Sequence, residues 1–180
     1  MLQGFRLKAL VADHPFIGLN RKRVKPKRAI GMTRTPPAKP NEAPDAQSFM
    51  DRFDAYPFHQ YLGMKLEHYR ENYACVTLTQ SADGPKGIGD GVHGGALATL
   101  VDMSAVAAVF SKLRPGEIPA GTADLQITYL RPARGKQIRC EATVLKRGRQ
   151  LATVEAKVIR EDGELCCDAR VLYAFRAGGS

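Results

Sequence analysis

Residues 95–110 read GALATLVDMSAVAAVF, and as a helix this run would carry apolar side chains around nearly its whole circumference. A helix of that kind has to be buried on every side. We predict a helix over about residues 94–113, ended by Arg114-Pro115-Gly116, since a proline and a glycine stop helices. Because the chain offers only one long helix, the other elements have to wrap it.

Outside this run the sequence predicts strands and turns. Apolar residues alternate at Ala142 and Val144 and again at Val154, Ala156 and Val158, with turn signals such as Glu161-Asp162-Gly163 between the runs. A short helical segment is expected at 49–56, and a glycine-rich loop covers 81–91. Strands are predicted at 64–70, 73–79, 122–130, 137–146, 151–160 and 164–175. The fold class is therefore α+β, an antiparallel sheet wrapped around one long central helix.

Composition limits the class of protein. The 180 residues are 44% hydrophobic and 25% charged, which supports a core and argues against a disordered chain. The longest weakly polar run, 94–110, is shorter than the roughly 20 residues that span a bilayer, and it contains Asp102. We therefore predict one domain without a membrane-spanning helix.

The positive charge is concentrated at the N-terminus. Residues 1–45 hold ten Lys or Arg against three acids, so most of the net charge of +9 lies there. We interpret 1–46 as a basic, Pro-rich, disordered leader before a domain at 47–180. A solvated tail is favoured over a nucleic-acid partner, and signal or transit peptides fit poorly. Translation from Met32 is a further hypothesis, which the intact mass of the native gene product would test.

The four cysteines, Cys75, Cys140, Cys166 and Cys167, fall in predicted strands. Their spacing matches no Cys or Cys/His ligand pattern, so we predict no metal and no redox cofactor. Unpaired thiols are typical of a reducing compartment, which favours a cytoplasmic location.

Asp102 is the feature of the helix that needs an explanation. A carboxylate within an otherwise apolar helix costs several kcal/mol unless it is paired, and a structural hydrogen bond is about as good an explanation as a function. The start of the helix favours a function for Asp102, because backbone N–H groups at Gly94 and Gly95 can stabilise an oxyanion. The combination suggests acyl transfer.

Spacing then predicts an oligomer. Gly94 and Asp102 are eight residues apart, or about 12 Å along a helix, so one reacting carbonyl cannot contact both within a single chain. An antiparallel helix from a second subunit would supply the other half. We expect a homodimer with two composite sites.

Three motifs resemble hotdog-fold acyl-CoA thioesterases of the PaaI-like group, in the 4-hydroxybenzoyl-CoA thioesterase superfamily: GVHGGALATLVD at 91–102, TADLQITYLRPA at 122–133 and ATVLKRGR at 142–149. The resemblance covers about residues 55–175. It implies a hotdog fold, a dimer or dimer of dimers, and hydrolysis of acyl-CoA thioesters without a cofactor.

Site residues follow from the same resemblance. It implies that Asp102 is the catalytic base or nucleophile, that the Gly94 N–H polarises the carbonyl, and that His93 and Thr122 assist. It further implies that the substrate is bound by Gly95, Tyr129, Arg147, Gly148 and Arg149. Arg131, Arg134 and Lys136 also carry charge at strand ends, where CoA phosphates could bind; a solvated strand end is as good an explanation for each.

One position departs from the family pattern. Relatives often carry Asn six residues before the His, where this chain has Gly87, which leaves the acyl preference open. Two alternatives also stay open: a hotdog enoyl-thioester hydratase or dehydratase, and a non-catalytic acyl-CoA-binding regulator whose basic leader contacts DNA. The leader lacks the two amphipathic helices of a helix-turn-helix.

Overall fold

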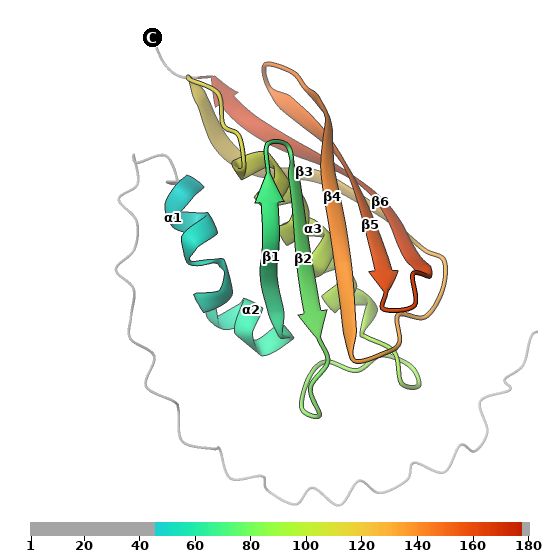
Figure 1. Ribbon diagram of the computed structural model, residues 1–180. Coiled ribbons are helices and arrows are strands. Elements are labelled where there is room, and N and C mark those ends of the chain that lie inside the picture. The colour runs from blue at the N-terminus through green and yellow to red at the C-terminus, as the bar shows by residue number, and fades with distance from the viewer. Residues whose placement is uncertain (1–45, 178–180) are drawn as a thin grey trace, which may run out of the picture. The chain divides into compact units, whose positions relative to one another are not determined.

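The computed structural model describes residues 46–177, in which a single antiparallel sheet curves around one long helix (Figure 1). The predicted leader, apart from Ala46, lies outside the described residues. The helical elements are α1 (Ala46–Asp51), η1 (Phe53–Ala55), α2 (Pro57–Leu62) and α3 (Gly94–Phe110). The strands are β1 (Met64–Arg70), β2 (Tyr73–Thr79), β3 (Glu117–Tyr129), β4 (Gln137–Arg147), β5 (Leu151–Arg160) and β6 (Leu165–Ala177).

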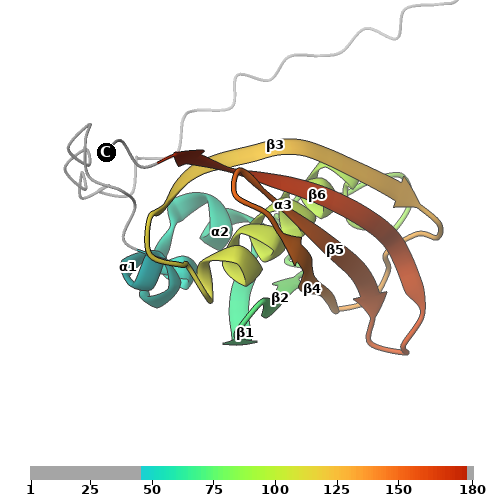
Figure 2. The same cartoon turned by 90° about the horizontal axis from the view of Figure 1, so that it is seen from above.

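The strand order is β1-β2-β4-β5-β6-β3, so β1 and β3 form the two edges of the sheet. Seen from above, the strands wrap α3 from both edges, and α1 and α2 lie beside its remaining side (Figure 2). Helix α3 packs chiefly against β2, β4 and β5. This arrangement confirms the predicted fold class.

Burial of α3 follows from its composition. From Ser104 to Phe110 every residue is buried, and Ser104 satisfies its hydroxyl by donating to the Leu100 carbonyl at 2.6 Å. Because the side chains of alanine and valine are small, the strands can approach α3 closely. Many buried residues of the sheet are small as well: Ala74, Val76, Cys140, Ala142, Val154, Ala156, Val158, Cys167 and Val171.

Most predicted element bounds agree with the structure, and three differ for identifiable reasons. The helix ends at Phe110 rather than 113, because Ser111 caps it by donating to the Ala108 carbonyl at 2.8 Å. The strand predicted from 122 begins at Glu117, since the edge position and a bulge accommodate Pro119. The segment at 49–56 is split into α1 and η1, and Pro57 starts α2.

Within residues 46–177, no helix is both long and apolar enough to cross a membrane. The same residues contain no group of three or more His, Cys, Asp or Glu side chains that could hold a metal ion.

Candidate active site

The start of α3 presents a free backbone donor. His93 is the N-cap residue, and its Nδ1 accepts a hydrogen bond from the Gly95 N–H at 3.0 Å. The imidazole therefore carries no proton on Nδ1. No acceptor in the described part of the chain bonds the Gly94 N–H. A free N–H at the positive end of a helix dipole can bind an anion or a developing oxyanion.

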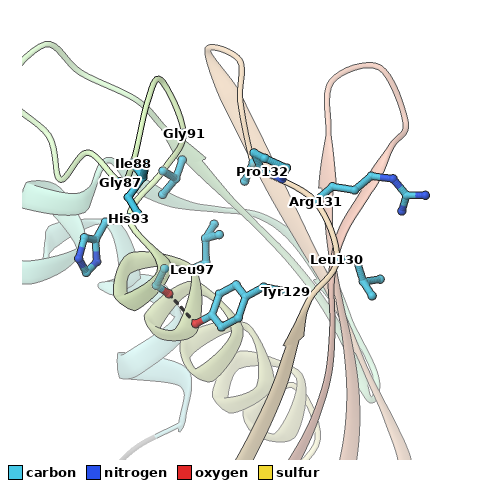
Figure 3. Close-up of a pocket in the computed structure, with 12 residues that line it drawn as sticks. Gly87, Ile88, Gly91, His93, Leu97, Tyr129, Leu130, Arg131 and Pro132 are labelled. Atoms are coloured by element: carbon cyan, nitrogen blue, oxygen red, sulfur yellow. Dashed lines mark hydrogen bonds between the residues drawn. The ribbon is translucent and has the colours of Figure 1, made fainter.

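A cavity of about 600 Å³ opens beside this donor. Figure 3 shows Tyr129 reaching from β3 to the helix start, where its hydroxyl donates to the Gly94 carbonyl at 2.8 Å. The cavity is lined by Gly87, Ile88, Gly91, Val92, His93, Gly94, Leu97, Tyr129, Leu130, Arg131, Pro132 and Ala133. Its lining is thus largely apolar, with backbone and a few polar groups at the helix start, as in many ligand sites.

Backbone hydrogen bonds hold the loop before α3 in place. The Gly87 N–H donates to the Gly91 carbonyl at 2.8 Å, and the Val92 N–H donates to the Ala133 carbonyl at 2.9 Å. A Cβ at Gly87 would lie 2.9 Å from the Val92 oxygen, closer than real Cβ contacts. Glycine is therefore required by this loop conformation, and an Asn here would displace the loop.

Asp102 lies two turns further along α3. One of its carboxylate oxygens accepts a hydrogen bond from the Thr122 hydroxyl of β3 at 2.6 Å. We expected this carboxylate to be buried, but it is partly exposed. Nearby, burial together with the negative charge of Asp102 raises the pKa of Tyr173 to about 12, so this phenol stays protonated.

The two halves of the predicted chemistry are separate within one chain. Asp102 is not among the residues that line the cavity at Gly94. The helix is continuous from Gly94 to Phe110, so the rise of about 1.5 Å per residue puts the two positions about 12 Å apart. Within one chain, Asp102 therefore contacts Thr122 and Gly94 contacts Tyr129. The two pairs do not contact each other.

A second, apolar hollow includes Met103 of α3. It has a volume of about 310 Å³ and is lined by Phe49, Tyr56, Pro57, Phe58, His59 and Met103. Met103 directly follows Asp102, and the aromatic residues come from the segment around α1 and α2. Sequence reasoning missed this hollow because an aromatic or Met side chain at helical spacing is indistinguishable from ordinary core.

The predicted cationic residues divide into two groups. The Arg147 side chain is only 3% exposed and pairs at 3.0 Å with Glu117, which is 10% exposed. It also donates to the Val109 carbonyl at 3.0 Å and to the Asn72 side chain at 3.2 Å. Arg147 therefore ties the far end of α3 to the sheet. Val109 is about 22 Å along the helix from Gly94, so Arg147 does not reach that cavity within one chain.

The neighbours of Arg147 lie in an accessible turn. The Gly148 N–H donates to the Leu151 carbonyl at 2.8 Å, and Arg149 is exposed. Arg131 lines the cavity, but its side chain points away from the helix start and pairs with Glu164 at 2.6 Å (Figure 3).

Comparison with known proteins agrees with this geometry. Residues 89–167 match the family described as the thioesterase superfamily. A medium/long-chain acyl-CoA thioesterase of Escherichia coli, YigI, is 28% identical over 133 residues, covering 65% of this chain and 84% of YigI. A putative esterase of Halobacterium salinarum is 33% identical over 124 residues, covering 66% of this chain and 80% of the esterase.

A solved structure extends the similarity to the fold. The PaaI protein of E. coli superposes with a TM-score of 0.63 at 21% identity, over 76% of this chain and 96% of PaaI.

Proposed function

Because the chain belongs to the thioesterase superfamily, with its hotdog fold and thioester-hydrolase chemistry, we propose that it hydrolyses acyl-CoA with Gly94 and Asp102 from opposing subunits. The products are a free acid and CoA. The observation that carries the residue assignment is the unbonded Gly94 N–H beside a cavity, on the same helix as an accessible Asp102.

The Gly94 N–H acts on the thioester carbonyl. As a nucleophile adds, the carbonyl oxygen gains negative charge, and a donor fixed at the positive end of α3 stabilises that charge more than it stabilises the ground state. The apolar lining of the cavity strengthens this interaction, because it keeps competing water away.

Asp102 supplies the second half of the reaction. It either removes a proton from an attacking water, or attacks the carbonyl to give a mixed anhydride while CoA leaves as the thiolate, after which water cleaves the anhydride. The Thr122 hydroxyl orients the carboxylate in both routes. A single turnover in ¹⁸O-water separates them, since only the anhydride route, when water attacks the Asp102 carbonyl, can put the label into Asp102.

An open sheet edge supports the second subunit. Within residues 46–177, strand β3 has 13 residues and pairs only with β6, so its other edge is free. Long unpaired edges are rare in isolated subunits because they promote association. We place a second β3 there, antiparallel to the first, so that the two helices run in opposite directions and Asp102 of one chain faces the Gly94 end of the other.

The substrate then has two regions. The acyl group extends from the carbonyl into the apolar hollow at Met103, which suits an aliphatic or aromatic group and is compatible with the medium/long-chain activity named for YigI. The CoA arm passes the turn that contains Gly148 and Arg149. Tyr129 lines the cavity that receives the thioester, and Gly95 follows Gly94 in the first turn of α3.

The first test is thiol release from a panel of aliphatic and aromatic acyl-CoAs. Asp102→Asn should lower kcat by about 10³-fold, which corresponds to about 4 kcal/mol of barrier. Asp83→Asn, an exposed acid in the loop before α3, is the matched control. Consumption of crotonyl-CoA without thiol release would instead indicate a hydratase, and CoA binding without any turnover would indicate a regulator.

Subunit mixing tests the composite site. Gly94→Pro deletes only the N–H, because proline suits the first helical position and His93 already has the extended ψ of 134° that precedes proline. Gly94→Ala, whose Cβ would lie 3.5 Å from the Tyr129 ring, keeps the N–H and should lose far less.

Asp102→Asn and Gly94→Pro chains refolded together should recover about a quarter of wild-type activity, because half of the dimers are mixed and each mixed dimer keeps one intact site. If each site lay within one chain, mixing would restore nothing.

A further inference from the structure

The peptide between Gly94 and Gly95 is the most flexible point next to the proposed oxyanion donor. Neither residue has a side chain, so both backbone dihedrals around this peptide are weakly restricted. Its N–H lies in the first turn of α3, where no residue of the preceding turn can accept it. Without other contacts, this peptide could rotate and change the direction of the neighbouring Gly94 N–H.

Two side chains hold this peptide from opposite ends. Its carbonyl oxygen accepts the Tyr129 hydroxyl at 2.8 Å, and its N–H donates to His93 Nδ1 at 3.0 Å. In Figure 3, Tyr129 approaches the helix start from β3, whereas the His93 ring lies on the other side. A rotation of the peptide would break both hydrogen bonds at once.

Tyr129 is itself well placed to act as a fixed support. It pairs in register with Cys167 of β6, and the Leu130 N–H donates to the Cys166 carbonyl at 2.8 Å. The ring packs against Gly94, where an added Cβ would lie 3.5 Å from its Cε1. Partial burial raises the pKa of Tyr129, so its hydroxyl remains a donor at neutral pH.

We propose that Tyr129 is a positioning residue that fixes the orientation of the Gly94 N–H through the Gly94 carbonyl. This inference rests on the proposed function, and it differs from the substrate-binding role that the sequence suggested for Tyr129. A donor that is already aligned need not reorganise when charge develops on the substrate. Its contribution therefore belongs to the transition state and not to substrate binding.

The two roles predict different kinetics. Tyr129→Phe keeps the ring and removes one hydrogen bond, so kcat should fall by about tenfold with KM nearly unchanged. Tyr61→Phe is the control, since Tyr61 is exposed on α2 and has no hydrogen bond within residues 46–177; it should change neither constant. A raised KM with unchanged kcat, or no effect at all, would overturn the proposal.

A second variant tests the restraint itself. The Tyr129 and His93 hydrogen bonds together form a clamp on the peptide between Gly94 and Gly95. Alanine at position 94 restricts the same backbone dihedrals, so Tyr129→Phe should lower kcat less in a Gly94→Ala background than in the wild type. Equal losses in both backgrounds would contradict the mechanism.

Hydrogen exchange gives a readout that does not depend on turnover. Tyr129→Phe should speed exchange of the Gly95 N–H and leave the amides of β4 and β5 unchanged. Unchanged exchange at Gly95 would overturn the clamp even if kcat fell. If the wild-type protein hydrolyses no thioester, the proposed function fails together with the catalytic role of Tyr129, and faster exchange would then identify a structural clamp only.

Discussion

The two edge strands of the sheet differ in how they meet α3. Strand β3 makes polar contacts along the whole helix: Tyr129 at its start, Thr122 at Asp102, and Glu117 through Arg147 at its end. Strand β1 makes no hydrogen bond to α3 within the described residues. Its edge is instead interrupted by a bulge and by Asp54, which accepts the Leu66 N–H at 2.9 Å.

The difference shows what each edge is adapted to. Bulges occur in both edge strands, so the difference lies in the Leu66 N–H of β1, which Asp54 occupies, whereas the 13 residues of β3 carry the side chains of the proposed site. The β3 edge therefore carries the proposed site and is where we propose that a second subunit pairs, whereas Asp54 blocks part of the β1 edge.

Arg147→Ala should have the largest effect on stability. The variant removes the cationic partner of the largely buried Glu117, which then keeps only the hydrogen bond from the Arg114 N–H, so the free energy of unfolding should fall by about 3–5 kcal/mol. Arg139→Ala is the matched control, because its pair with Glu141 is 38% exposed on both sides and should be worth at most about 1 kcal/mol. Urea denaturation measures the free energy of unfolding of both variants. Equal losses would show that the pair of Arg147 and Glu117 stabilises the fold no more than an exposed ion pair.

Thr122→Val should come next and affect turnover. It removes a hydrogen bond to a carboxylate, an interaction worth about 1.5–3 kcal/mol, so kcat should fall by about tenfold to a hundredfold. Thr122→Ser keeps the hydroxyl and should restore most of the rate. If the valine variant were as active as the wild type, the contact between β3 and Asp102 would be structural only.

Asp54→Ala should have the smallest effect, and it tests whether the β1 edge contributes to stability without affecting turnover. Loss of the hydrogen bond to Leu66 should cost about 1 kcal/mol of unfolding free energy, with kcat unchanged. Asp83→Ala, an exposed acid in the loop before α3, is the control. A fall in kcat comparable to that of Thr122→Val would show that the β1 edge also affects turnover.

The sequence predicted those parts of the molecule that depend on local patterns. The apolar run at 95–110 identified α3, and alternation identified β4 and β5, because periodicity reports directly which faces are buried. Reasoning from the apolar helix singled out Gly94 and Asp102, which the structure places on α3, and the resemblance added the roles of His93 and Thr122. The residue roles and the subunit arrangement remain predictions.

What the sequence could not supply are contacts between distant segments. Tyr129 and Gly94 are 35 residues apart, and Arg147 and Glu117 are 30 apart, so no periodicity links them. A charged residue next to Gly148 is typical of an exposed turn, and only the three-dimensional packing shows that Arg147 points inward. The hollow at Met103 is likewise formed by three separate segments.

The four buried thiols have a chemical consequence. Thioesters exchange readily with thiolates, so an accessible cysteine near the reacting carbonyl would compete with water and become acylated itself. Here burial raises the pKa of Cys140 and of Cys167 to about 12, and it also raises the pKa of Cys75 and Cys166. We therefore expect that in the folded protein none of the four thiols captures the acyl group or reacts with a disulfide reagent used to count released CoA.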